Sequence, residues 1–149
     1  MNMLKRLEPL GRNHLPLLAA WFEDAEVQER MDGMLPLEDW FDYASANDMY
    51  YMWLAYQEEQ PVGLIFIELD GEAGYIGLIT DPSLRNQGYG KAMVRELMNH
   101  PELQSVHTWV ACIEADNKPC LACFKSLGYV TDEEEPDEDG FYNLVYERS

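Results

Sequence analysis

The chain has 149 residues and a mass of 17.3 kDa, with 47% hydrophobic residues and a formal net charge of -18. That length suits one domain, expected over residues 1–149, and the apolar content is enough to bury a core, which excludes a disordered or fibrous protein. The negative charge excludes nucleic acids and anionic membranes as partners, because Lys and Arg mediate binding to both. No apolar run reaches the roughly 18 residues that a membrane-spanning helix needs.

The N-terminal residues and the cysteines together predict a cytoplasmic protein. Residues 1–7 lack the apolar stretch of a secretory signal, and the three cysteines form an odd, sparse set. Cys120 and Cys123 have the spacing of metal ligands, but only Cys112 and His107 are plausible additional ligands for the four that a structural zinc requires. We therefore expect no metal site and assign these cysteines to the apolar side of a helix.

In the first third of the chain, the pattern predicts one strand and two helices. The strand covers residues 4–10, and Asn13 can cap a helix that continues to about Arg30, with Leu18 and Trp21 in its apolar stripe. After Pro36, apolar residues recur at helical spacing over residues 37–46 and predict the second helix.

Strands follow in the middle of the chain. Residues 50–56, 62–69 and 75–80 are rich in β-branched and aromatic residues and are separated by turn-forming residues, which predicts an antiparallel meander. We then expect a helix from Gly88 to Pro101, a strand over residues 106–111, a short helix over 119–127 and a last strand over 141–146. Residues 132–139 include seven acidic residues out of eight and predict a solvated loop.

The acidity is unevenly distributed along the chain. From Arg85 to Lys125 there are five basic and four acidic residues, so this segment carries +1, whereas the rest of the chain has five basic and 24 acidic residues. A segment with so few acidic residues is expected where it holds an anion and the remaining surface faces water or a cationic molecule. The alternative is that the acidic residues only maintain solubility.

The segment from Arg85 to Lys125 follows the predicted strand over residues 75–80 and begins with a glycine-containing turn that leads into a helix. Gly88 and Gly90 allow a tight turn and a close approach of the backbone to a ligand, and the first helical turn offers unpaired N–H groups. Together with the helix dipole, these features predict a site for an anion such as a pyrophosphate. The spacing matches neither the dinucleotide fingerprint nor the P-loop.

The sequence of this turn resembles the GNAT family of acetyl-CoA-dependent N-acetyltransferases. Arg85-Asn86-Gln87-Gly88-Tyr89-Gly90 satisfies the family pattern Arg/Gln-x-x-Gly-x-Gly/Ala, and Asn117 followed by a short helix and Leu127-Gly128-Tyr129 is similar to a second family motif. The resemblance implies an α+β fold with three α/β/α layers: a mixed, mostly antiparallel central sheet with helices on both faces. It also implies acetyl-CoA as the cofactor.

The resemblance assigns roles to particular residues. The expected cofactor-binding residues are Ile79, Asp81, Arg85, Gln87, Gly88, Tyr89, Gly90, Lys91 and Asn117. In this assignment, backbone N–H groups from Gln87 to Lys91 hold the pyrophosphate of CoA. The backbone of Ile79 and Asp81 pairs with the pantetheine arm, the Ile79 N–H polarises the thioester carbonyl, and Asn117 binds the arm from the neighbouring strand.

Two positions bear on proton transfer. The acceptor amine must lose a proton, and Glu72, acting through water, is the first candidate for the base, with Tyr75 or Asp81 as alternatives. Glu72 can equally be only a turn residue. The general-acid tyrosine of the family corresponds here to Phe124, which cannot donate a proton. Three alternatives follow: another group or water protonates the leaving thiolate, the thiolate leaves unprotonated, or the activity has been lost.

The expected acceptor is a small cationic primary amine. Residues 21–27, 80–82 and 101–129 look similar to aminoglycoside 6'-N-acetyltransferases, and the acidic early helices favour a polyamine-like or aminosugar acceptor, attacked directly in a ternary complex. A protein N-terminal or lysine acetyltransferase and a catalytically weak CoA-binding module are the alternatives. A homodimer is left open.

Overall fold

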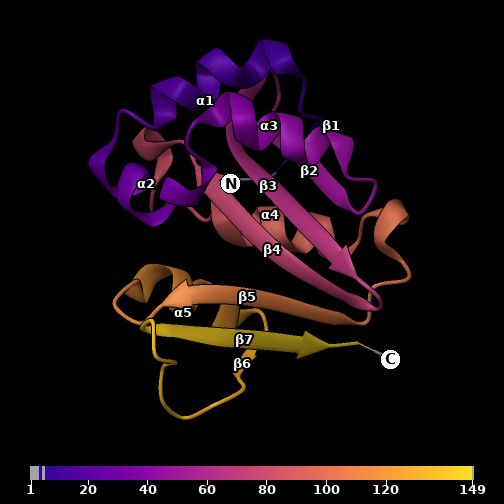
Figure 1. Ribbon diagram of the computed structural model, residues 1–149, viewed down its shortest axis with the longest axis vertical. Helices are drawn as coiled ribbons and strands as arrows, with labels where there is room; N and C mark the ends of the chain where they lie inside the picture. The colour runs from indigo at the N-terminus through magenta and orange to yellow at the C-terminus, as the bar shows by residue number, and fades with distance from the viewer. Residues whose placement is uncertain (1–3, 5, 149) are drawn as a thin grey trace.

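The computed structural model describes residue 4 and residues 6–148, and within this part of the chain the strands form one seven-stranded sheet (Figure 1). Its strand order is β1-β2-β3-β4-β5-β7-β6. β4 and β5 pair in parallel, and the other neighbours pair antiparallel. The mixed, mostly antiparallel sheet is thereby confirmed. The strands are β1 (Arg6–Pro9), β2 (Tyr50–Gln57), β3 (Gln60–Asp70), β4 (Ala73–Thr80), β5 (Thr108–Glu114), β6 (Val130–Thr131) and β7 (Phe141–Glu147).

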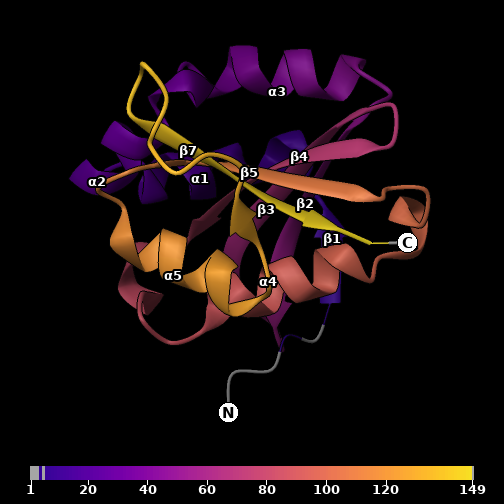
Figure 2. The same cartoon turned by 90° about the horizontal axis from the view of Figure 1, so that it is seen from below.

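Helices cover both faces of the sheet, as Figure 2 shows with α3 on one side and α4 and α5 on the other. The α-helices are α1 (Leu15–Trp21), α2 (Ala25–Arg30), α3 (Leu37–Ala46), α4 (Tyr89–Met98) and α5 (Lys118–Ser126), and short 3-10 helices cover Arg12–His14, Asp32–Met34, Pro82–Leu84 and Pro101–Leu103. None of the described helices has both the length and the apolar character needed to cross a membrane.

Each face of the sheet has its own hydrophobic core. Side chains alternate along a strand, so neighbouring residues of β3 point to opposite faces. Leu64 packs with α1, α2 and α3, whereas Ile65 packs with α4 and α5, and both are fully buried. The two cores fix the helices on either side of β4 and so position the ends of β4 and β5.

Three expected elements differ in the structure. The helix expected over residues 13–30 is wrong: α1 ends at Trp21, and the Asp24 side chain accepts hydrogen bonds from the N–H groups of Glu26 and Val27, both at 3.1 Å, which begins α2. The opening strand covers four residues rather than seven, and Lys5 lies outside the described residues. The sequence analysis missed β6, which has only two residues and carries no strand pattern of its own.

Candidate active site

β4 and β5 diverge at their carboxyl ends. They pair only between Ala73–Ile76 and Thr108–Ala111, so the last four residues of β4 have no partner on β5. A cleft of about 790 Å³ opens at this divergence. It is lined by β4, the loop into α4, β5, α5 and, across the opening, α2, which lies near the carboxyl ends of both strands (Figure 1).

The register of β4 corrects one part of the predicted cofactor contacts. The Asp81 N–H donates to the Val62 carbonyl at 2.8 Å, and Asp81 O accepts from the Leu84 N–H at 2.8 Å, so the expected pairing of Asp81 with pantetheine is wrong. Antiparallel pairing alternates along a strand, so Ile79, which lies opposite Leu64, also directs its N–H and C=O toward β3. The backbone groups that face the cleft belong to Leu78 and Thr80.

The turn after β4 leaves several N–H groups at the start of α4 without an intrahelical acceptor. Asn86 and Gly88 have φ angles of +63° and +87°, and the first helical bond of α4 runs from the Ala92 N–H to the Gly88 carbonyl at 3.1 Å. The N–H groups of Tyr89, Gly90 and Lys91 precede this bond. They lie at the edge of the cleft and at the positive end of the helix dipole, an arrangement that can bind an anion.

The side chains of the same segment have different surroundings. Arg85 lines the cleft and forms an ion pair with Asp24, the N-cap residue of α2, including a hydrogen bond of 3.3 Å from Nη1 to Oδ1. The Tyr89 side chain is buried and donates to Gln57, so only its backbone is available to a ligand. Lys91 lines the cleft, and Gln87 is exposed in the turn.

Asn117 lies on the opposite side of the cleft, where β5 leads into α5. It is the N-cap residue of α5 and lines the cleft together with Cys120 and Phe124. This places Asn117 and the Leu78–Thr80 edge on the two sides of one opening.

The expected catalytic base, Glu72, lies at the wrong end of β4. It is exposed in the β3–β4 turn, where its carbonyl accepts from the N–H groups of His107 and Thr108. The lining of the cleft on β4 begins at Ile76, and four residue steps along the strand, about 13 Å at 3.3 Å per residue, separate Glu72 from it. Glu72 does not line the cleft. Tyr75 is closer, is 49% exposed and lies on the face of the sheet that carries α3.

Phe124 stands at the position that the resemblance assigns to the general acid. It lines the cleft, is only 2% exposed and packs edge-on against Tyr129 with ring centroids 4.9 Å apart. Cys120 and Cys123 lie on the same helix, and burial raises the pKa of Cys120 to about 12 and also raises the pKa of Cys123. Both thiols are therefore neutral near pH 7. Among the described residues, no group of three His, Cys, Asp or Glu side chains is arranged to hold a metal ion.

α2 contributes functional candidates that the sequence analysis did not single out. Arg30 extends from α2 to the end of β5, where its Nη1 lies 2.7 Å from Asp116 Oδ1 and 3.1 Å from Glu114 Oε1. Hydrogen bonds to Asp116 and Glu114 raise the pKa of the guanidinium above its ordinary value. Glu26 lines the cleft from the same helix. No local signal identifies Arg30, because its partners lie more than 80 positions away in sequence.

Carboxylates surround the face of the sheet that carries α3. The acidic loop between β6 and β7 lies on that side (Figure 2). Cys112 of β5 is exposed there, and partial desolvation of its thiol, together with the negative charges of Asp137 and Asp132, raises its pKa. Glu68 accepts a hydrogen bond from the Tyr43 hydroxyl at 2.8 Å on the same face.

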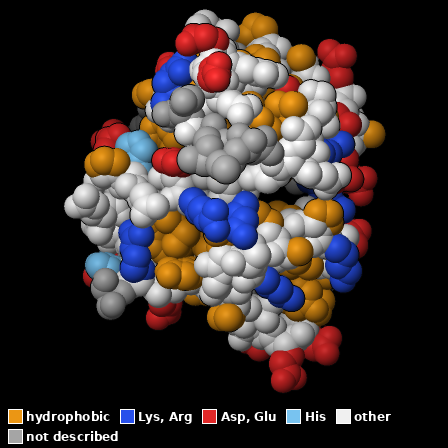
Figure 3. Space-filling view, turned by 180° about the vertical axis from the view of Figure 1, so that it is seen from behind, with side chains coloured by type: hydrophobic (Ala, Val, Ile, Leu, Met, Phe, Trp, Pro, Cys, Tyr) orange, Lys and Arg blue, Asp and Glu red, His pale blue; other side chains and the backbone are white. Residues whose placement is uncertain are grey.

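Basic side chains gather on the other face. Figure 3 shows Lys and Arg groups across the side that carries α4 and α5. These helices contain Lys91, Arg95, Lys118 and Lys125. The divergence of β4 and β5 thus separates a basic face from an acidic face.

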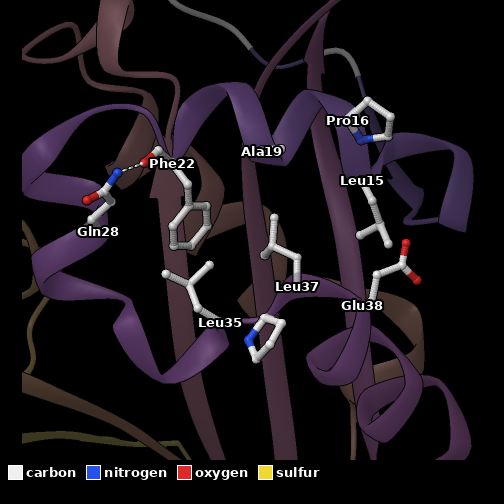
Figure 4. A pocket seen from close by; sticks show the side chains of 9 residues that line it. Leu15, Pro16, Ala19, Phe22, Gln28, Leu35, Leu37 and Glu38 are labelled. Carbon is white, nitrogen blue, oxygen red and sulfur yellow. Dashed lines mark hydrogen bonds between the residues drawn. The ribbon is translucent and has the colours of Figure 1, made fainter.

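A second hollow, of about 480 Å³, lies away from this cleft, between α1, α2 and the start of α3 (Figure 4). Apolar side chains such as Phe22, Leu35 and Leu37 line it, and Gln28 is held by a hydrogen bond of 2.7 Å to the Phe22 carbonyl. It contains none of the predicted site residues, so the cleft between β4 and β5 is the candidate active site.

Comparisons with known proteins agree with this geometry. The model of the acetyltransferase (GNAT) family matches residues 15–129. The chain is 41% identical over 145 residues to the uncharacterized N-acetyltransferase YfmK of Bacillus subtilis, covering 97% of this chain and 98% of that protein.

Solved structures of low sequence identity share the fold. Spermidine N-acetyltransferase of Vibrio cholerae, bound to CoA and spermine, is 11% identical with a TM-score of 0.80, covering 95% of this chain and 94% of that one. AAC(6')-Ib, bound to paromomycin and acetyl-CoA, is 19% identical with a TM-score of 0.77, covering 99% of this chain and 94% of that one. The chain therefore belongs to the acetyltransferase (GNAT) family, whose members are acyltransferases with acetyl-CoA as co-substrate.

Proposed function

We propose that the protein transfers the acetyl group of acetyl-CoA to a primary amine of a small cationic molecule, by direct attack while both substrates are bound. The observation that carries the proposal is the division of charge across the gap between β4 and β5. An anionic cofactor suits the basic α4–α5 face, and a cationic acceptor suits the acidic α3 face. The solved structures of similar fold include enzymes bound to spermine and to an aminoglycoside, which supports this acceptor class.

The residues of the cleft fit acetyl-CoA. The N–H groups of Tyr89, Gly90 and Lys91 suit its pyrophosphate, and a Cβ added at Gly90 would project into the cleft, with its nearest neighbours 3.8–3.9 Å away on Leu78, Cys123 and Thr80. The backbone groups of Leu78 and Thr80 and the side chain of Asn117 suit the amides of the pantetheine arm. When bound, acetyl-CoA supplies an acyl group activated as a thioester.

The chain has two tasks in the reaction. It must direct a hydrogen-bond donor at the thioester carbonyl, for which the Leu78 N–H at the inner end of the cleft is suited. It must also accept a proton from the amine, because only the neutral amine is a nucleophile. Two carboxylates line the cleft: Glu114 is paired with Arg30, whereas Glu26 forms no ion pair within the described residues. Glu26, acting directly or through water, is therefore our candidate for the base.

A transfer assay tests the proposal. Release of the CoA thiol is measured with spermidine, an aminoglycoside and a lysine-rich peptide as acceptors, at low and high salt. We expect turnover with the small amines and a KM for the amine that rises with salt, because salt screens the acidic face. Turnover with the peptide alone would contradict the small acceptor and favour a protein acetyltransferase. CoA binding without any turnover would identify a binding module.

Variants separate the two faces. Asp132→Asn and Asp137→Asn should each raise the KM for the amine about two- to fivefold, the effect of one partly screened charge. Glu96→Gln on α4 is the matched control and should leave that KM unchanged. Glu26→Gln should lower kcat while leaving the affinity for acetyl-CoA intact. A wild-type kcat for Glu26→Gln would exclude Glu26 as the base.

A further inference from the structure

On the α3 face of the sheet, the lining of the cleft reaches a pair of residues on β3 and β4. Phe66 and Gly77 lie opposite each other in the register of these two strands, and both line the cleft. A Cβ added at Gly77 would overlap the Phe66 ring, which shows that the ring lies over the glycine. The surface of the cleft is therefore apolar where it meets this face.

Glu68 and Tyr75 are the next pair on the same face. They lie opposite each other on β3 and β4, and side chains opposed in this way have Cβ atoms about 4.5–5.5 Å apart. Because residues two apart on a strand share a face, this pair follows Phe66 and Gly77 at a distance of about 7 Å. The Tyr75 side chain is 49% exposed. A carboxylate and an accessible aromatic ring thus lie side by side just beyond the lining of the cleft.

The Glu68 carboxylate is oriented but carries an unpaired charge. Its Oε2 accepts hydrogen bonds from the Tyr43 hydroxyl at 2.8 Å and from Asn47 Nδ2 at 3.3 Å. The hydrogen bond to Glu68, and the negative charge of Glu68, raise the pKa of Tyr43. Among the described residues, no Lys or Arg forms an ion pair with Glu68 or lies over the Tyr75 ring. This arrangement suits an ammonium group, which can pair with the carboxylate and contact the ring.

The distance from the reacting end of the cleft decides which ammonium group fits there. Leu78, whose N–H suits the thioester carbonyl, lies three residue steps from Tyr75, about 10 Å at 3.3 Å per residue. The amine that attacks the thioester therefore cannot also contact Tyr75. A second cationic group of the same molecule can do so, if an apolar chain of this length joins the two groups and lies across the Phe66 ring.

We propose that Glu68 and Tyr75 bind a second ammonium group of the acceptor, about 10 Å from the amine that is acetylated, so that the acceptor is a linear polyamine. The inference rests on the proposed function, which places the thioester at Leu78. Tyr43 is then a positioning residue, because its hydroxyl orients the Glu68 carboxylate. The apolar Phe66 ring favours the methylene chain of a polyamine over the hydroxyl groups of an aminosugar.

Two amines of equal length test this assignment. Diaminooctane and octylamine share the same carbon chain, but only diaminooctane has a second ammonium group. The wild type should have a KM for diaminooctane about tenfold below that for octylamine, the combined effect of one ion pair and one cation–π contact. Glu68→Gln and Tyr75→Leu should each reduce this KM ratio about two- to fivefold. Tyr75→Phe keeps the aromatic ring and should retain the wild-type ratio.

Glu96→Gln is the matched control, because it removes one carboxylate from α4, on the other face of the sheet. It should retain the wild-type ratio. Equal KM values of the wild type for the two amines would overturn the assignment, as would a wild-type ratio in Glu68→Gln or Tyr75→Leu, or an equal loss in Glu96→Gln. No turnover of diaminooctane by an enzyme that acetylates another small amine would also overturn it. If no amine is acetylated at all, the proposed function fails instead.

Discussion

Replacing Gly90 with alanine should separate cofactor binding from folding. Gly90 is the second residue of α4, and an added Cβ would lie no closer than 3.8 Å to its neighbours, which is ordinary van der Waals contact. The protein therefore accommodates alanine without a clash. Because alanine is favoured over glycine in a helix by roughly 0.5–1 kcal/mol, the variant should be slightly more stable, with a Tm higher by about 2 °C.

Cofactor affinity should change in the opposite direction. The new methyl group projects into the cleft, where it would hinder the approach of the pyrophosphate to the N–H groups at the start of α4. Loss of one such charged hydrogen bond should weaken CoA binding by about 10- to 100-fold, and Gly90→Leu should weaken it further. Calorimetry and thermal unfolding measure the two effects on the same samples.

Gly33→Ala is the matched control, because nothing lies within 4 Å of a Cβ added there and Gly33 lies outside the cleft. It should bind CoA like the wild type. If Gly90→Leu bound CoA within twofold of the wild type, the helix start would not be the pyrophosphate site. If Gly90→Ala were clearly less stable than the wild type, the space attributed to the cleft would be absent.

Three further predictions concern stability and thiol chemistry. Leu64→Ala should reduce the free energy of unfolding, measured in urea, by about 3 kcal/mol, because Leu64 is fully buried in the interior strand β3. Val130→Ala, at a residue that is 64% exposed, should change it by less than about 0.5 kcal/mol. Hydrogen bonds from Arg85 and from the backbone N–H of Val27 hold the pKa of Asp24 below its ordinary value of 3.8. The stability advantage of the wild type over Asp24→Asn, measured by urea titration, should therefore be constant above about pH 5 and shrink as the pH falls below about 4. An advantage that stayed constant down to about pH 3 would refute this. Burial raises the pKa of Cys120 to about 12. Its rate of alkylation by iodoacetamide should therefore rise about tenfold per pH unit between pH 7 and 9, as measured by peptide mass spectrometry. A plateau of the rate in that range would show an ionised thiol.

Local patterns predicted the elements whose boundaries depend on nearby residues. α3 covers Leu37–Ala46 as expected, because Pro36 precedes its first turn and apolar residues recur at helical spacing. The meander of β2, β3 and β4 also matches, since short turns at Glu58–Glu59 and at Gly71 separate the β-rich stretches. Over residues 13–30, apolar residues recur at helical spacing across the interruption between α1 and α2. The pattern did not reveal this interruption, because it depends on the hydrogen bonds of the Asp24 side chain.

The site depended on contacts that local patterns do not contain. The glycines predicted the turn into α4 as a local feature, and Gly88 has a φ angle of +87° there. Pairing of β4 with β3, including the hydrogen bond from the Asp81 N–H to the Val62 carbonyl, decides which residues of β4 face the cleft. The backbone groups that face it belong to Leu78 and Thr80, one residue away from the expected Ile79 and Asp81. The ion pair of Arg30 with Asp116 joins residues 86 positions apart.

The central claim is that CoA is held in the gap between β4 and β5 by the amides at the start of α4 and by the cleft-facing edge of β4. Titration of ¹⁵N-labelled protein with CoA, followed amide by amide in NMR spectra, tests it most directly. We predict large shifts for Tyr89, Gly90 and Lys91 and for Leu78 and Thr80, with smaller shifts for Ile79 and Asp81, whose N–H groups face β3. Unchanged amides at the start of α4, or larger shifts at Ile79 and Asp81 than at Leu78 and Thr80, would contradict the account.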